Sequence, residues 1–253
     1  MKNIEIRGVK IGEGMPKIII PLVESTETEI IQKLKSFKEL KYDAVEWRAD
    51  FFDEVLNFEK VTEVLSEIRN LIPDKIVFFT YRTKKEGGNK EISVENYCAL
   101  NKAVAETGDA DIIDVEIFIG YEEAERNINN IHSCNVLVVA SNHDFYKTPD
   151  KDDIISRMCK MQDVGADILK IAVMPQSPED LLTLMSATYE MRQKYTNKPI
   201  ITMSMGALGM MSRLAGEIFG SAFTFGAVGE TSAPGQIPAD QLHTVISIIH
   251  QNI

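Results

Sequence analysis

The chain lacks the features that mark membrane, metal-binding and nucleotide-binding proteins. No apolar run approaches the ~18 residues of a membrane-spanning helix, and the start of the chain, Met1 to Arg7, has no apolar core typical of a signal peptide. The motifs GxGxxG, GxxxxGK[ST], HxH and HExxH do not occur. We therefore expect a cytoplasmic protein without a nucleotide-binding motif and without a catalytic metal ion.

Cysteine and positive charge are also scarce. The three cysteines, Cys98, Cys134 and Cys159, form no CxxC, and their odd number fits reduced thiols. The net charge is −11, from 27 basic and 38 acidic residues, which argues against nucleic acid or an anionic membrane as a partner. An anionic ligand must then be bound by individual, locally placed arginines.

What the sequence does contain is a regular alternation of short apolar runs and segments of helical period. With 253 residues and 44% hydrophobic content it can bury a full core. The predicted strands are Ile18–Val23, Ala44–Arg48, Ile76–Tyr81, Ile112–Ile117, Val136–Ser141, Asp167–Ile171, Pro199–Met203 and Ala222–Phe225. Eight such units indicate a single (β/α)8 barrel domain over residues 1–253, because an open doubly wound sheet would have fewer strands and a glycine-rich first turn.

Capping signals place several helix starts. Thr26 with Glu29 resembles a capping box, and the pairs Thr148-Pro149 and Ser177-Pro178 resemble an N-cap followed by proline at the first helical position. Residues 1–14 contain three glycines among alternating residues. We expect them to form a short β-hairpin that precedes the barrel and covers its bottom.

The alternation of side chains along each strand predicts which of them enter the barrel. On the second strand Glu46, Arg48 and Asp50 share one face, and Val45, Trp47 and Ala49 share the other. The apolar face suits the helix layer, so the charged face points into the barrel or its mouth. The same reasoning brings to the carboxyl ends of the following strands the side chains of Phe78, Thr80, Arg82, Asp114, Glu116, Val139, Ser141, His143 and Lys170. Barrel enzymes keep their active sites at that end, although a purely stabilising ion-pair network is the alternative.

Lys170 is the most informative of these residues, because it interrupts the apolar run from Ala166 to Ala172. An ammonium group there is disfavoured by burial, and an enclosed lysine amine is a nucleophile that forms Schiff bases with ketones. The alternative is an edge strand that leaves the lysine in solvent. His143 lies one βα unit earlier, so the imidazole and the amine can act on one substrate.

Three features after the sixth strand have both structural and functional interpretations. Met203 and Met205 are either ordinary core residues or an apolar wall beside Lys170. Arg213 is by default a solvated arginine, and it becomes a carboxylate clamp only if the start of its helix faces the mouth of the barrel. The small, flexible segment from Gly226 to Gln236 resembles a mobile lid rather than a loop without a role.

Together these motifs resemble type I 3-dehydroquinate dehydratase, the Schiff-base-forming lyase of the shikimate pathway for aromatic amino acid biosynthesis. The resemblance covers nearly the whole chain. It rests on the order of the motifs VEWRAD (45–50), YRT (81–83), KEGG (85–88), DVE (114–116), SNHDF (141–145), LKIA (169–172), MSMG (203–206), SR (212–213) and TSAPGQ (231–236).

The resemblance implies that Lys170 forms an imine with the C3 ketone of 3-dehydroquinate and that His143 is the general base and acid. Glu86 would hold the His143 tautomer, and Arg213 would pair with the substrate carboxylate. The remaining implied contacts with the substrate come from Glu46, Arg48, Arg82, Met203, Met205, Phe225, Ser232, Ala233 and Gln236. The family further implies no cofactor, no metal and a homodimer.

Two other functions remain open at this point. A class I aldolase would also use a barrel lysine, but it needs a phosphate cradle of backbone N–H groups, for which the run from Gly206 to Gly209 is a poor match. A non-catalytic, carboxylate-binding barrel is the second alternative. The presence of Lys170, His143 and Arg213 argues against it.

Overall fold

A computed structural model describes residues 4–229 and 232–253. The elements run in the order β1 (Ile4–Ile6), β2 (Val9–Ile11), β3 (Lys17–Leu22), α1 (Glu27–Lys35), β4 (Ala44–Arg48), η1 (Ala49–Phe51), α2 (Phe58–Leu71), β5 (Ile76–Thr80), η2 (Lys84–Glu86), α3 (Val94–Thr107), β6 (Ile112–Glu116), η3 (Ile117–Ile119), α4 (Tyr121–His132), β7 (Leu137–Asp144), α5 (Lys151–Asp163), β8 (Ile168–Val173), α6 (Pro178–Glu190), η4 (Met191–Tyr195), β9 (Ile200–Ser204), α7 (Met210–Leu214), α8 (Gly216–Phe219), β10 (Phe223–Ala227), β11 (Ile237–Pro238) and α9 (Ala239–His250). Within these residues no helix is both long and apolar enough to cross a membrane.

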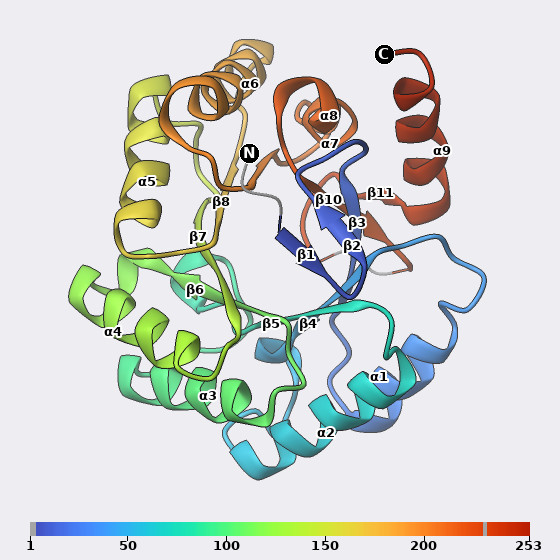
Figure 1. Ribbon diagram of the computed structural model, residues 1–253, viewed down its shortest axis with the longest axis vertical. Helices are drawn as coiled ribbons and strands as arrows, with labels where there is room; N and C mark the ends of the chain where they lie inside the picture. The colour runs from blue at the N-terminus through green and yellow to red at the C-terminus, as the bar shows by residue number, and fades with distance from the viewer. Residues whose placement is uncertain (1–3, 230–231) are drawn as a thin grey trace.

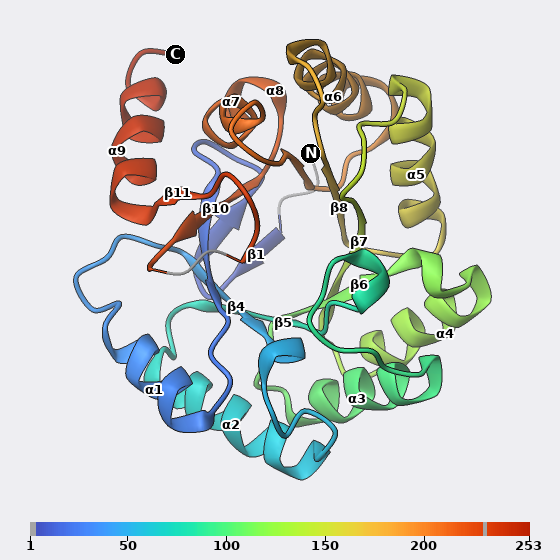
Figure 2. The ribbon, with the colours of Figure 1, turned by 180° about the vertical axis from the view of Figure 1, so that it is seen from behind.

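The eight predicted strands form the barrel. Parallel pairing runs from β10 through β3, β4, β5, β6, β7 and β8 to β9. The ring closes where Ile200 at the start of β9 bridges to Ser221 and the Ala222 N–H donates to the Ile200 carbonyl at 2.7 Å. The helices surround this ring, as Figures 1 and 2 show from its two ends. The predicted (β/α)8 fold is therefore confirmed.

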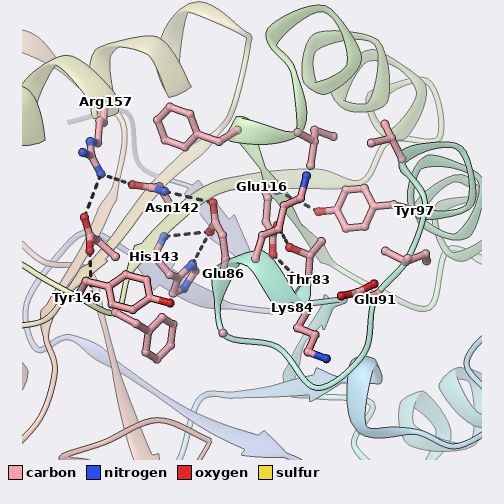
Figure 3. A pocket seen from close by; sticks show the side chains of 18 of the residues that line it. Thr83, Lys84, Glu86, Glu91, Tyr97, Glu116, Asn142, His143, Tyr146 and Arg157 are labelled. Carbon is pink, nitrogen blue, oxygen red and sulfur yellow. Dashed lines mark hydrogen bonds and ion pairs between the residues drawn. The ribbon is translucent and has the colours of Figure 1, made fainter.

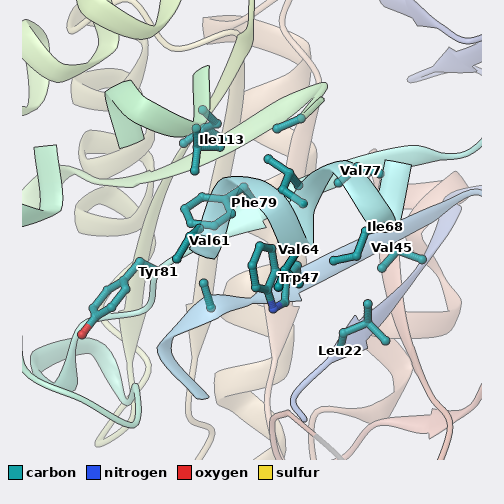
Figure 4. Packing of buried hydrophobic residues seen from close by; sticks show 14 of the residues in the cluster. Leu22, Val45, Trp47, Val61, Val64, Ile68, Val77, Phe79, Tyr81 and Ile113 are labelled. Atoms are coloured by element: carbon teal, nitrogen blue, oxygen red, sulfur yellow. The ribbon is translucent and has the colours of Figure 1, made fainter. Parts of the chain in front are cut away.

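Strand alternation divides the buried side chains as predicted. On β4, Val45 and Trp47 belong to the core between sheet and helices, whereas Ala44 belongs to the cluster inside the barrel. Figure 4 shows Trp47 beside Phe79 under α2, and the two rings meet edge to face with centroids 5.6 Å apart. Because one face of the strand is committed to this packing, Glu46 and Arg48 have to point inward.

The N-terminal hairpin covers the bottom of the barrel. β1 and β2 are antiparallel, and Ile11 is fully buried in the same cluster as Ile19 and Ile76 from the barrel strands. Arg7 adds an ion pair to Asp111 at 2.9 Å, just before β6 begins. Figure 1 shows the hairpin lying across this end of the barrel, which leaves the opposite end as the mouth.

Two of the three predicted helix starts are confirmed. Glu29 accepts from the Thr26 N–H at 3.1 Å, and Asp180 accepts from the Ser177 N–H at 3.2 Å. The prediction for Thr148 is wrong, because α5 begins at Lys151 with Asp150 as its N-cap. The Thr148 hydroxyl instead donates to the Met174 carbonyl at 3.2 Å and ties the loop after β7 to the end of β8.

Candidate active site

Lys170 lies inside the barrel, at the third position of β8, and its side chain is 5% exposed. Its apolar neighbours Leu169 and Ile171 point outward, into the helix layer. The ammonium itself contacts two carboxylates, with Nζ 3.1 Å from Glu46 Oε1 and 3.0 Å from Asp114 Oδ2. Lys170 is thus enclosed as expected, and the alternative of an edge strand with the lysine in solvent is wrong, since β8 lies between β7 and β9. The amine contacts carboxylates rather than its apolar neighbours in sequence, because those flanking residues lie on the opposite face of the strand.

One aromatic ring completes the surroundings of the amine. The Lys170 Nζ atom lies 4.9 Å from the centroid of the Phe225 ring, within the range of a cation–π interaction. The pocket around the amine is therefore suited to a positive charge, which is the charge that a protonated imine would also carry.

A buried ion-pair network connects Asp114 to the next charges in the barrel. Arg82 Nη2 lies 2.8 Å from Asp114 Oδ2, and Arg82 Nη1 lies 2.9 Å from Glu116 Oε1. Although burial disfavours the guanidinium, the carboxylates of Asp114 and Glu116 raise the pKa of Arg82 well above its usual value. Burial likewise opposes ionisation of Asp114, but Arg82 and Lys170 outweigh it and lower the pKa of this carboxyl. The buried ion-pair network that was the alternative to an active site is therefore present, and Lys170 belongs to it.

Glu86 and His143 form a second buried pair. Glu86 Oε2 accepts the His143 backbone N–H at 2.9 Å and lies 2.9 Å from His143 Nδ1. Burial, reinforced by the Glu116 carboxylate, raises the pKa of Glu86 to about 8. Burial and the cations Arg82, Lys170 and Arg48 lower the pKa of His143 well below its usual value. The His143 imidazole is thus held neutral. When the pH falls, Glu86 rather than His143 takes up the proton.

Arg48 is positioned by a neighbour on its own chain segment. Its Nε and Nη2 donate to the two carboxylate oxygens of Asp50 at 2.7 and 2.8 Å. Asp50 also accepts the backbone N–H of Asn89 at 2.9 Å. This bidentate pair fixes the guanidinium at the rim of the barrel.

The structure brings all the predicted site residues except Arg213 to one small cavity of about 40 Å3. Gly87, Phe145 and Ala172 also line it. They were not predicted as site residues, although all three belong to motifs that were recognised, KEGG (85–88), SNHDF (141–145) and LKIA (169–172). The positions of Gly87 and Phe145 follow from a close approach: a Cβ atom on Gly87 would overlap the Phe145 ring, so only glycine lets the ring reach this wall.

Arg213 lies behind the segment that covers the cavity. It is 2% exposed, and its Nη2 donates to the Pro234 carbonyl at 3.1 Å. Among the described residues its Nε atom has no hydrogen-bond partner, and burial lowers the pKa of this guanidinium to about 10. A buried arginine without a carboxylate among the described residues is suited to receive an anionic ligand.

The covering segment belongs to the stretch from Gly226 to Gln236 that was predicted to be a mobile lid, of which Glu230 and Thr231 lie outside the described residues. The predicted start of this stretch is wrong, because Gly226 and Ala227 are part of β10. Gln236 accepts the Ser232 N–H at 3.0 Å and donates to the Ser232 hydroxyl at 2.9 Å. The Gly206 N–H donates to the Pro234 carbonyl at 3.1 Å, so the segment rests on the turn after β9. β11, which was not predicted, then joins the segment to β10.

The described residues contain no cluster of three or more histidine, cysteine or acidic side chains arranged to hold a metal ion. Their chemistry is that of a lysine amine beside carboxylates, a neutral imidazole on a carboxyl, and a buried arginine behind the covering segment. This combination suits covalent catalysis on a ketone followed by proton transfer.

Comparison with known proteins shows the family of this chain. The family model described as type I 3-dehydroquinase matches residues 18–253. A 3-dehydroquinate dehydratase of Bacillus subtilis is 52% identical over 252 residues, covering 100% of this chain and 99% of the relative. A second 3-dehydroquinate dehydratase, from Clostridioides difficile, is 48% identical over 252 residues, again 100% of this chain and 99% of the relative.

Solved structures give the same result. The crystal structure of a type I 3-dehydroquinate dehydratase from Clostridium difficile with covalently modified comenic acid superimposes with a TM-score of 0.97 at 48% identity, covering 100% of this chain and 99% of that one. The structure of a 3-dehydroquinate dehydratase from Enterococcus faecalis gives 0.91 at 39% identity, with 97% and 98% covered.

Proposed function

The chain belongs to the type I 3-dehydroquinase family, and we propose that it dehydrates 3-dehydroquinate through a Schiff base on Lys170, with His143 as general base and acid. The family's activity is that of a hydro-lyase of the shikimate pathway, which gives 3-dehydroshikimate and water. The observation that carries the mechanism is one cavity lined by the Lys170 amine and by a histidine whose Nδ1 is bound to a carboxylate. The family assignment favours this reaction over that of an aldolase.

Lys170 supplies the covalent step. Its amine, once deprotonated, attacks the C3 ketone, and loss of water gives a protonated imine. Glu46 and Asp114 lie 3.1 and 3.0 Å from Nζ in the resting site and would face the iminium cation that replaces the ammonium. Because these carboxylates are already in place, the positive charge is stabilised without rearrangement. The covalently modified comenic acid in the Clostridium difficile relative is consistent with a covalent step in this family.

His143 and Glu86 move the protons. With Glu86 ionised, His143 Nδ1–H donates to Oε2 and the lone pair of Nε2 is free to take the C2 proton. The Nδ1 proton then moves to Glu86, because the pKa of Glu86 lies above that of His143. As the Nε2–H formed in this way protonates the departing C1 hydroxyl, which leaves as water, Glu86 returns its proton to Nδ1, so that the ionised carboxylate and the neutral imidazole are restored. Hydrolysis of the conjugated imine finally releases the product and restores the amine.

Binding of the substrate carboxylate falls to Arg213 and the lid. Arg213 is the buried arginine without a carboxylate partner among the described residues, and its Nη2 holds the lid at Pro234. The Ser232 and Gln236 side chains face the same cavity as Lys170. Arg48 and Arg82 contact the ring hydroxyls and the imine region in this proposal, and Met203, Met205 and Phe225 form its apolar wall.

A turnover assay with the purified protein tests this function. Added 3-dehydroquinate should be converted to 3-dehydroshikimate, which is followed by the absorbance of its conjugated double bond, and EDTA should leave the rate unchanged. Binding of 3-dehydroquinate without conversion would show a non-catalytic barrel. Loss of activity on treatment with EDTA, restored by a divalent metal, would contradict the metal-free mechanism.

A further inference from the structure

A second, larger cavity lies on the far side of Glu86 and His143. It has a volume of about 860 Å3 and shares Glu86, Gly87, His143 and Phe145 with the active-site cavity. Figure 3 shows it between η2, the end of β7 and α5, with a chain of contacts leading from Arg157 to His143. This chain leaves the barrel interior, because Asn142 points from β7 toward the helix layer while His143 points inward.

The contacts from Arg157 through Asn142 to Glu86 have only one possible direction. Arg157 Nη1 donates to Asn142 Oδ1 at 2.9 Å, and an arginine can only donate. The other end of the Asn142 amide must therefore be the NH2 group, which donates to Glu86 Oε1 at 3.2 Å. Both Glu86 oxygens are then acceptors, since Oε2 receives the backbone N–H of His143 and faces its Nδ1.

Arg157 is itself held firmly. Its Nη2 and Nε donate to the Asp153 carboxylate at 2.8 and 3.2 Å, and its guanidinium lies 5.8 Å from the centroid of the Phe118 ring. Asp144 adds an oxygen 3.9 Å from Nη1. A group restrained on several sides keeps the Asn142 amide from turning over, because turning would place the amide NH2 against the guanidinium.

We propose that Arg157 and Asn142 are positioning residues that select the catalytic tautomer of His143. By presenting an N–H to Glu86, the amide stabilises the ionised carboxylate, which accepts His143 Nδ1–H and leaves Nε2 unprotonated toward the substrate. Without the restraint the amide can turn its oxygen to Glu86, which favours a protonated carboxyl that donates to Nδ1 and places the proton on Nε2. This inference rests on the proposed general-base role of His143.

The charges around Glu86 agree with this assignment. Arg82 lies 3.7 Å from Oε2 and favours the carboxylate, whereas burial, Glu116 and Asp114 favour the protonated form. The N–H bond from Asn142 acts with Arg82, because it lowers the pKa of Glu86. Loss of that bond should therefore raise the pH at which the base-competent form appears.

The test compares three variants by 15N NMR of histidine-labelled protein and by kcat/KM against pH. Asn142→Asp keeps the shape and the bond to Arg157 but replaces the donor by an oxygen, and Arg157→Met removes the restraint on the amide. Lys160→Met is the matched control, because Lys160 is on the same helix and lines the same cavity but its ammonium lies over the Tyr121 ring, 5.6 Å from the centroid. The His143 signals are assigned with His143→Ala.

Above about pH 8, where Glu86 is ionised in the wild type, we expect His143 to carry its proton on Nδ1 in the wild type and in Lys160→Met, and to shift toward Nε2–H in the two other variants. The kcat/KM of these two variants should fall by about tenfold to a hundredfold, with little change in KM. The rise of kcat/KM on the acidic side of the pH profile should move to higher pH. Where the carboxylate itself is replaced in a comparable pair, an incorrect tautomer lowers kcat by up to ~10⁴. Arg157→Lys, which can still donate to Oδ1, should recover most of the loss.

An unchanged His143 tautomer in Asn142→Asp and Arg157→Met would overturn the inference. A changed tautomer with full turnover would support the positioning and contradict the general-base role of His143, so the two claims fail separately. An equal loss of kcat/KM in Lys160→Met would also overturn the inference, since the loss would then follow from removing any positive charge from α5.

Discussion

At the scale of single residues, the account depends on a division of roles within one cavity. Lys170 is surrounded by carboxylates and an aromatic ring, which favour positive charge, whereas His143 is surrounded by cations and is kept neutral. The two groups can therefore act in turn, first on the ketone and then on the C2 proton.

His143→Ala should separate imine formation from proton transfer. We expect turnover to fall by ~10² to 10⁴, the usual contribution of a general base, while borohydride still traps an adduct with 3-dehydroquinate. His132→Ala is the control, because His132 pairs with Asp167 at 2.8 Å and does not line the cavity. Rapid turnover of His143→Ala would remove this histidine from the chemistry.

Glu86→Gln should change the pH dependence of the reaction. Because burial first, and then Glu116, raise the pKa of Glu86 to about 8, its carboxylate forms as the pH rises. The base-competent pair is therefore lost below about pH 8, and kcat/KM of the wild type should rise with pH and level off above that value. Glu86→Gln should be less active by ~10-fold to 10²-fold and lack this limb.

Glu91→Gln provides the matched control for that experiment. Glu91 lines the larger cavity but not the smaller one. Its replacement should leave the rise of kcat/KM with pH in place. Loss of this rise in both variants would mean that it does not come from Glu86.

At the scale of elements, the lid is held by a close backbone approach. Gly235 has φ +77°, and a Cβ atom there would overlap the Gly206 carbonyl. Only glycine allows this contact, which brings the Pro234 carbonyl to Arg213 and to the Gly206 N–H.

Gly235→Ala should therefore displace the lid and raise KM by about tenfold or more, equivalent to a loss of ~1.4 kcal/mol. Gly229→Ala is a matched control, since Gly229 has a similar φ of +75° but a Cβ atom there would meet, among the described residues, only the end of the Lys33 side chain. Hydrogen exchange across the described part of the lid should slow on adding product in the wild type and much less in Gly235→Ala. Equal protection with and without product would mean a fixed loop.

Strand alternation explains why so much of the site was predictable from sequence. Once Trp47 is assigned to the helix layer, Glu46 and Arg48 must face the barrel, and the same reasoning applies to Arg82, His143 and Lys170. What it could not predict is partnership across elements. Arg157 is a helix residue with nothing unusual nearby in sequence, and its contact with Asn142 depends on how α5 packs beside β7.

Local signals also failed where tertiary contacts compete with them. Thr148-Pro149 has the form of a helix start, but the Thr148 hydroxyl is used by the Met174 carbonyl from the next strand. β11 has only two residues, too few for any alternation to appear in the sequence.

At the scale of the whole molecule, the barrel has one closed end and one working end. The hairpin buries Ile11 fully against the inner cluster at the bottom, while the charged side chains gather at the mouth. Stability and catalysis should therefore be separable by position.

Ile11→Ala should lower the free energy of unfolding by about 2–5 kcal/mol, because it leaves a cavity in the inner core, and should leave kcat and KM of the folded enzyme unchanged. Lys10→Ala, which removes an exposed side chain of the same strand, should change the free energy of unfolding by less than ~0.5 kcal/mol. Urea titration measures both. A large drop in kcat of folded Ile11→Ala would contradict the separation.

The covalent role of Lys170 is tested most directly on the unmodified protein. Borohydride added together with 3-dehydroquinate should reduce the imine, abolish activity in proportion to labelling, and leave a permanent adduct that mass spectrometry locates on the peptide containing Lys170. Borohydride without substrate should leave the protein active. An adduct on a different lysine, or full activity after exhaustive treatment with both reagents, would contradict the account.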